Sequence, residues 1–274
     1  MINVLSLGAG VQSSTLALMA AKGEIPMPDC AIFADTEGEP NEVYIWLDWL
    51  IGQLPYPVYK VTKGSLEEKT IKLQVSKISK KRYMSGKIPA FVLSPEGNKG
   101  LLGRSCTADY KIRPVVSKIR DLLGLKQVRS KEVLVNQWMG ISTDEASRMK
   151  PSREAWIKHE YPLIERNMSR NDCFEWMEKN GYPVPPRSSC LYCPFHSDDE
   201  WLRIKTDMPD EFEQIIKFEK RLQINASQCE ILKGVPYLHG SCEPIGSIDF
   251  KKIKPKKKEQ LDMFDNECEG MCGL

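Results

Sequence analysis

A glycine-rich turn near the amino terminus could bind an anion. Residues 6–15 read SLGAGVQSST, in which Gly8 and Gly10 let the backbone approach a ligand closely. The apolar run 3–7 predicts a buried strand, and residues 13–22 predict a helix that hydroxyl side chains could cap. The free N–H groups and positive dipole end of such a helix attract phosphate. We expect the turn to bind through Ser6, Gly8, Gly10, Gln12, Ser13 and Ser14.

Two other phosphate-binding loops fit this turn less well. A Walker A loop requires Gly-Lys-Ser/Thr, and the turn contains no lysine. A dinucleotide fingerprint matches only at Gly8 and Gly10, because Ser13 stands where its third glycine belongs. In that interpretation Asp35, at the end of the second predicted strand, would bind a ribose. The dinucleotide interpretation therefore stays open as an alternative.

A Cys-x-x-Cys pair could hold a metal. Cys190 and Cys193 lie in SSCLYCPFHS, and two thiolates at this spacing can reach one metal ion or one cluster. The chain has nine cysteines and no signal-peptide pattern, so metal or redox chemistry is favoured over disulfides. Further ligands must come from elsewhere in the chain. Cys30 and Cys173, within a predicted strand and a predicted helix, are interpreted as core thiols.

Strands and helices alternate along the first sixty residues. Strands are predicted at 3–7, 30–34 and 57–61, and helices at 13–22 and 41–54. This alternation predicts an α/β fold with a doubly wound, mostly parallel sheet, followed by a cysteine-rich C-terminal extension. Later elements are predicted at 114–123, 133–138, 171–180 and 210–222, and the basic segment 72–104 is interpreted as an insertion or lid.

Composition sets limits on the class of protein. The chain has 274 residues, 41% of them hydrophobic, and no apolar run long enough to cross a membrane, which predicts a cytoplasmic globular protein. The net charge of +2 depends on six lysines within 251–258; without them acidic residues outnumber basic ones. We expect a nucleotide-binding domain at 1–165, a helical region bearing the Cys-x-x-Cys pair at 166–250, and a lysine-rich, cysteine-containing tail at 251–274.

Several segments resemble one family in the same order. The turn GAGVQSS resembles the SGGxDS loop of the adenine-nucleotide α-hydrolase (PP-loop) superfamily, and is closer to its form in phosphoadenosine phosphosulfate (PAPS) reductases, where Gln replaces the aspartate. IFADTEGEP resembles the strand-then-Asp-Thr-Gly segment of those reductases, although Glu37 intrudes before the glycine. CTADYKIRP, at 106–114, resembles a segment of the ATP pyrophosphatase of DNA phosphorothioation, and WMGISTDEASR resembles the family's later strand-and-glycine element.

The resemblance implies site residues beyond the turn. Asp35, Thr36 and Gly140 would lie near the adenosine, with Asp35 also a candidate catalytic residue. The basic residues Lys111, Arg113 and Arg148 could neutralise phosphate or sulfate, or could equally be surface charges. It also implies a [4Fe–4S] cluster, with zinc as the alternative. The candidate cluster ligands are Cys106, Cys190, Cys193, Cys268 and Cys272, with His196 as a further option.

Two short segments of the tail resemble known motifs. Glu267-Cys268 resembles the nucleophilic Glu-Cys-Gly tail of PAPS reductases, so Cys268 or Cys272 could attack sulfur, hold a cluster, or do neither. Residues 260–264, QLDMF, resemble the peptide by which bacterial DNA-processing proteins dock on the sliding clamp. We favour the simpler interpretation that QLDMF packs on the protein body. The upstream lysines could attract nucleic acid, or could form a solvated linker.

Together these features predict an iron–sulfur enzyme that binds ATP with Mg²⁺, adenylates an acceptor and transfers sulfur to it, the acceptor being a nucleic acid such as tRNA or DNA. A sulfur-donor protein or reductant would then be a partner. The alternative is sulfonucleotide reduction with bound PAPS, which Gln12 favours. A further alternative is a non-catalytic, nucleotide-binding or clamp-docked accessory protein.

Overall fold

The computed structural model describes residues 1–125 and 130–252, and its contacts divide the chain into two compact units. Within the described residues, unit 1 comprises 1–63 and 107–189, and unit 2 comprises 64–106 and 190–252. The boundary expected at residue 165 falls inside unit 1, and the cysteine-containing tail lies outside the described residues. No helix of the described residues has the length and apolarity that a membrane crossing requires.

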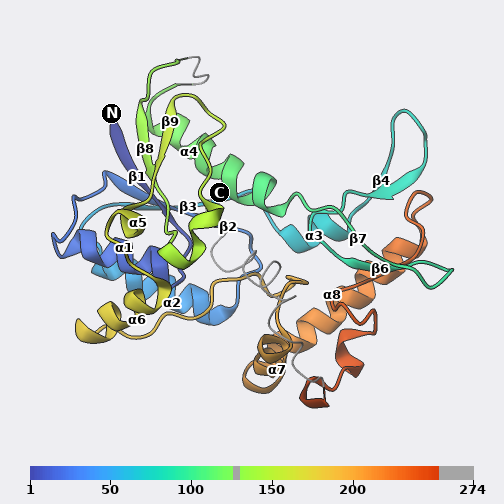
Figure 1. Ribbon diagram of the computed structural model, residues 1–274. Coiled ribbons are helices and arrows are strands. Elements are labelled where there is room, and N and C mark those ends of the chain that lie inside the picture. Colours follow the sequence, from blue (N-terminus) through green and yellow to red (C-terminus); the bar gives the residue numbers. More distant parts are fainter. Residues whose placement is uncertain (126–129, 253–274) are drawn as a thin grey trace. The chain divides into compact units, whose positions relative to one another are not determined.

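Unit 1 is built on a five-stranded parallel sheet in the order β3-β2-β1-β8-β9 (Figure 1). Its strands are β1 (Ile2–Leu7), β2 (Cys30–Asp35), β3 (Val58–Thr62), β8 (Val135–Trp138) and β9 (Ile157–Glu160). Its helices are α1 (Val11–Ala21), α2 (Asn41–Gln53), α4 (Arg113–Leu122), α5 (Pro162–Glu165) and α6 (Arg170–Lys179). The register pairs Val4 with Cys30 and with Gln137, so β1 is the central strand.

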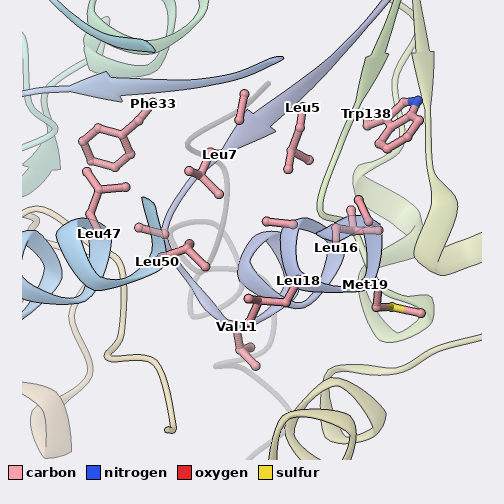
Figure 2. Packing of buried hydrophobic residues seen from close by; sticks show 14 of the residues in the cluster. Leu5, Leu7, Val11, Leu16, Leu18, Met19, Phe33, Leu47, Leu50 and Trp138 are labelled. Carbon is pink, nitrogen blue, oxygen red and sulfur yellow. The ribbon is translucent and has the colours of Figure 1, made fainter. Parts of the chain in front are cut away.

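Alternating side chains of the strands supply two apolar clusters, one on each face of this sheet. On one face, Leu5, Leu7 and Phe33 pack against α1 and α2, as Figure 2 shows. On the other face, Val4 and Ile32 pack with Ile119 and other residues of α4. Strands buried on both faces require helices on both sides. The α/β, doubly wound, mostly parallel fold expected from the sequence is therefore confirmed.

Unit 2 consists of helices and short antiparallel strands. Its helices are α3 (Leu66–Ile71), α7 (Asp198–Asp207) and α8 (Pro209–Ser227). A two-stranded sheet pairs β4 (Leu73–Val75) with β5 (Arg82–Met84), and a three-stranded sheet has the order β10-β6-β7, from Val235–Tyr237, Phe91–Leu93 and Lys99–Leu101. The segment 72–104, interpreted as an insertion or lid, thus contains two antiparallel hairpins.

Candidate functional site: a pocket at the end of β1

The turn after β1 leads directly into α1. Gly10 is the N-cap residue, and no side chain caps this helix, whose first backbone hydrogen bond runs from Ser14 N–H to Gly10 O. The N–H groups of Val11, Gln12 and Ser13 therefore have no intrahelical acceptor. The Ser13 hydroxyl accepts from Gly8 N–H at 3.1 Å and donates to Gly10 O at 3.3 Å, which fixes the turn.

The loop after β8 packs against the same turn. Met139, Gly140 and Ile141 line a pocket together with Ser6, Gly8 and residues 10–13. A Cβ at Gly140 would lie 2.9 Å from Ser13 N and 3.0 Å from Ser13 Cα. Only glycine therefore lets this loop approach the start of α1 so closely. Gly140, expected from the family resemblance to lie near a bound adenosine, lies against the first turn of α1.

Two arginines and several apolar residues also line the pocket. Arg170, the first residue of α6, and Arg187 both line it, and the Ser188 hydroxyl donates to Gly8 O. Phe174 and residues 184–186 (Val-Pro-Pro) give it an apolar side. The pocket holds about 190 Å³, and no carboxylate is among the described residues that line it. The lining thus combines cationic and apolar side chains.

The pocket lies at the point in the parallel sheet where the order of the strands changes direction. From β1 the chain proceeds outward to β2 and β3 on one side, and later to β8 and β9 on the other. The crevice at the carboxyl ends of β1 and β8 is therefore the topological switch point, the place where open α/β sheets bind ligands. Figure 1 shows these two strands side by side within unit 1.

Most, but not all, of the residues expected to bind a ligand in the turn line the pocket. Ser6, Gly8, Gly10, Gln12 and Ser13 line the pocket. The Gln12 amide lies 3.5 Å from the Ser142 hydroxyl, and Ser6 accepts from the Gln137 amide at 2.6 Å.

Ser14 and Thr15 do not line the pocket. Ser14 is fully buried and accepts from Trp46 Nε1 at 3.0 Å, whereas the Thr15 hydroxyl lies 3.5 Å from Cys173 O. The expectation that hydroxyls cap this helix is wrong: the helix begins at Val11, so Ser14 and Thr15 lie inside it and hold neighbouring elements.

Asp35 ends β2 and is held by its neighbours. Its Oδ1 accepts from the Tyr44 hydroxyl at 2.8 Å and from Glu37 N–H at 2.7 Å. Burial, and next the hydrogen bond to Asp35, raise the pKa of Tyr44, so this phenol stays a donor. Glu37 has a φ of 55°, the left-handed backbone that glycine adopts most easily. Asp35 is not among the residues lining the pocket.

A buried ion pair lies beside the end of β2. Thr36 donates to Glu39 Oε1 at 3.2 Å, and Lys111 Nζ lies 3.7 Å from the same oxygen, with both charged side chains nearly inaccessible. Lys111 belongs to a π-helical turn, Thr107–Ile112, that precedes α4; such turns are frequent at functional sites. Thr36 and Lys111 thus belong to one buried cluster next to the expected adenosine site.

The other two expected cations pair with carboxylates of their own segments. Arg113 pairs with Asp109 four residues earlier. Arg148 pairs with Glu145 at 2.7 Å, and both of these side chains are at least 90% buried. Neither arginine lines the pocket.

The cysteines expected to hold a cluster are only partly described. Cys106, Cys190 and Cys193 belong to unit 2, whereas Cys268 and Cys272 lie outside the described residues. His196, the other expected ligand, bonds the Cys190 carbonyl through Nε2 at 3.0 Å. Among residues 1–125 and 130–252, no three His, Cys, Asp or Glu side chains converge on a possible metal position. The described donors therefore do not form a complete site for a cluster or for zinc.

Sequence reasoning missed the pocket's two arginines. Arg170 follows a helix cap and Arg187 follows two prolines, and neither position carries a local pattern that indicates a ligand. A β-α-β fold brings residues from opposite ends of unit 1 to the same turn, so only the folded chain shows these arginines beside Gly8 and Gly10.

Comparisons with known proteins give a likeness in structure and none in sequence. No protein-family model matches the chain, and no curated protein matches it. Among solved structures, it is similar to phosphoadenylyl-sulfate (PAPS) reductase from Candida auris in a phosphate complex, with 15% identity and a TM-score of 0.41. The match covers 68% of this chain and 75% of that one.

Proposed function

We propose that the pocket binds the phosphates of an adenine nucleotide, and that the chain is an enzyme acting on that nucleotide. One observation carries the proposal: the uncapped N-terminus of α1 and the side chains of Arg170 and Arg187 line the same pocket. Unpaired N–H groups and guanidinium groups both bind phosphate oxygens strongly. The apolar side, with Phe174 and Pro185, suits a base, and the PP-loop resemblance of the turn supports adenine.

The reaction that the sequence favours is adenylation of an acceptor by ATP, followed by sulfur transfer. The acceptor oxygen attacks the α-phosphorus, pyrophosphate leaves, and sulfur then displaces AMP. In this reaction the α1 N-terminus and Arg187 would hold the phosphates and stabilise the charge that develops on them. The pocket's lining offers no carboxylate for Mg²⁺, and the described cysteines do not complete a cluster site, so we derive no step through either group.

Sulfonucleotide reduction remains the second candidate, and the same lining favours it. An amide, Gln12, stands in the turn at the place of the aspartate in the loop that it resembles, and two arginines line the pocket. In that reaction a cysteine thiolate attacks the sulfur of the bound sulfate and releases the nucleotide; a thiol reductant then frees sulfite. Cys268 and Cys272 are the candidate nucleophiles, and both lie outside the described residues.

Calorimetric titration with ATP, AMP and PAPS tests the binding step. Arg187→Gln and Arg170→Gln should each weaken binding about 10- to 100-fold, since hydrogen bonds between charged groups are worth about 1.5–3 kcal/mol. Arg153→Gln is the matched control, because Arg153 is exposed and does not line the pocket. Equal affinities for all four proteins would refute the proposal.

Product assays then separate the reactions. Pyrophosphate released from ATP identifies the adenylating enzyme, and sulfite released from PAPS identifies the reductase. Binding that depends on Arg187 without either product would identify a nucleotide-binding accessory protein. Tight binding of NAD without binding of ATP or PAPS would favour the dinucleotide alternative.

A further inference from the structure

The β4–β5 hairpin of unit 2 has a strongly positive surface. Residues 72–87 read KLQVSKISKKRYMSGK, with six basic residues and no acidic one. The lysines at and near its tip, Lys77, Lys80 and Lys81, are exposed, and none of the three forms an ion pair with a described carboxylate. Ile78, between them, is 96% exposed. The hairpin thus combines a basic surface with an exposed isoleucine at its tip.

Strand pairing and hydrogen bonds fix the conformation of the hairpin. Cross-strand pairing sets Leu73 opposite Met84 and Val75 opposite Arg82, and the Tyr83 hydroxyl donates to Gln74 Oε1 at 3.2 Å. At the tip, Lys80 N–H donates to Ser76 O at 3.0 Å. The lysines are therefore presented in a fixed order along the ribbon.

Glu230 contacts the hairpin next to its tip, because Arg82 pairs with Val75, the last strand pair before the turn. Its N–H donates to Arg82 O at 3.0 Å, and its Oε1 accepts from Arg82 N–H at 3.1 Å. The same carboxylate lies 3.5 Å from Arg82 Nε and also interacts with the charge of Lys81. Lys77 and Lys80 lie farther along the turn, and neither forms an ion pair with a described carboxylate.

We propose that the hairpin 72–87 binds a nucleic acid, with its lysines on the phosphates and Ile78 against a groove or an unstacked base. A two-stranded ribbon fits the major groove of a duplex. Regularly placed lysines release counterions from a polyanion, which makes binding salt-dependent. Exposed isoleucines also serve as apolar wedges between bases, which accounts for Ile78 better than an acidic protein surface would.

The surface belongs to unit 2, so the inference does not require the nucleotide pocket of unit 1 to be correct. It does suit the reaction favoured above, in which the acceptor is a nucleic acid. Binding is therefore measured without nucleotide. Arg187→Gln is included as the variant that should lose nucleotide affinity and keep nucleic-acid affinity, which separates failure of one proposal from failure of the other.

The test is fluorescence anisotropy of the full chain with a labelled DNA duplex, its single strand and an RNA hairpin, over about 50–200 mM salt. The variant is Lys77→Gln, Lys80→Gln and Lys81→Gln combined. It keeps Arg82 and the pairing of β4 with β5, and circular dichroism checks its fold. The control combines Lys217→Gln, Lys220→Gln and Lys233→Gln, three exposed lysines of the same unit, with the same loss of charge.

The hairpin variant should bind at least about tenfold more weakly, and the slope of log K against log salt should fall by about 2–3, or about 0.9 per lost phosphate contact. The control should change the slope by less than about 1, and Ile78→Ala should lower affinity without changing the slope. The preferred nucleic acid among the three probes is the one the site recognises.

Three results would overturn the inference. They are no binding at the lowest salt, equal slopes for the hairpin variant and the wild type, or displacement by poly-glutamate as effective as by duplex at equal charge. Equal slopes would also place any nucleic-acid binding elsewhere in the chain.

Discussion

The two units of the chain are stabilised differently. Unit 1 is held by a parallel sheet buried between two apolar clusters, and its pocket depends largely on backbone groups of one turn. Unit 2 has strands of only three residues, and polar side chains join its distant segments, as where Arg221 binds Glu67 and Glu68. The difference indicates that unit 1 tolerates little change in its backbone, whereas unit 2 buries apolar side chains such as Trp201 and Phe218 and adds ion pairs between its segments.

The largest expected difference between the units is in thiol reactivity. Burial raises the pKa of Cys173 to about 12 and that of Cys30 to about 11, both in unit 1. At pH 8 only about one Cys173 thiol in 10,000 would then be a thiolate. We expect iodoacetamide to modify Cys106 and Cys190 of unit 2 at least about a hundredfold faster, as measured by peptide mass spectrometry after treatment with a chelator.

The same raised pKa values predict how the stability of the folded protein changes with pH. The folded state keeps these thiols protonated, so their contribution to stability is complete below the ordinary thiol pKa of 9.0 and is lost as the pH rises through about 11 for Cys30 and about 12 for Cys173. Denaturation in urea should remove the difference in labelling rates. Rapid labelling of Cys173 in the native protein would contradict its burial.

The next largest effect is expected at the pocket, from Gly140→Ala. The added methyl group would lie 2.9 Å from Ser13 N, so the first turn of α1 must shift. We expect nucleotide affinity to fall about tenfold or more and the free energy of unfolding to fall by about 1–3 kcal/mol. Calorimetry and urea denaturation measure the two quantities.

Gly52→Ala is the control for this variant. Gly52 lies in α2, and a methyl group there would meet no atom within 4 Å. This variant should bind nucleotide normally and gain about 0.5–1 kcal/mol of stability, because alanine favours a helix. Normal binding by Gly140→Ala would show that the contact with Ser13 does not shape the site.

The sequence predicts unit 1 well because its elements are long and periodic. The strand expected at 30–34 is observed at 30–35, and the helix expected at 41–54 is observed at 41–53. In unit 2 the three-residue strands β4 to β7 are too short to show any period, so they were not predicted. The pocket's turn was predicted from its glycines, whereas Arg187 was not, because its place there depends on tertiary structure.

An intermediate effect is expected from Gly234→Ala in unit 2. Gly234 has a φ of 120°, and a Cβ there would lie 2.5 Å from Leu93 O, between β10 and β6. We expect a loss of about 2 kcal/mol, concentrated in unit 2. Hydrogen exchange should show faster exchange of the β6 and β10 amides and unchanged β1 amides, with nucleotide affinity kept. Equal loss of protection in β1 would show that the units do not differ in this way.

The smallest effect is expected from Arg221→Gln, which tests how much an ion pair between distant segments adds to the stability of unit 2. Arg221 on α8 donates to Glu67 at 3.0 Å and to Glu68 at 2.8 Å on α3, with 47% of its side chain exposed. Exposed pairs contribute little, so we expect about 0.5–1 kcal/mol, declining toward zero in 1 M salt because salt screens exposed charges.

Lys60→Gln in unit 1 is the matched control, since Lys60 forms one exposed pair with Asp48 and lies on a sheet that its apolar clusters hold. It should change the unfolding free energy by less than about 0.5 kcal/mol. Repeating Arg221→Gln in a Glu68→Gln background should give about half the effect of the single substitution, because the pair with Glu67 remains. If Lys60→Gln cost as much as Arg221→Gln, the ion pairs of Arg221 would add no more to unit 2 than an exposed pair adds to unit 1.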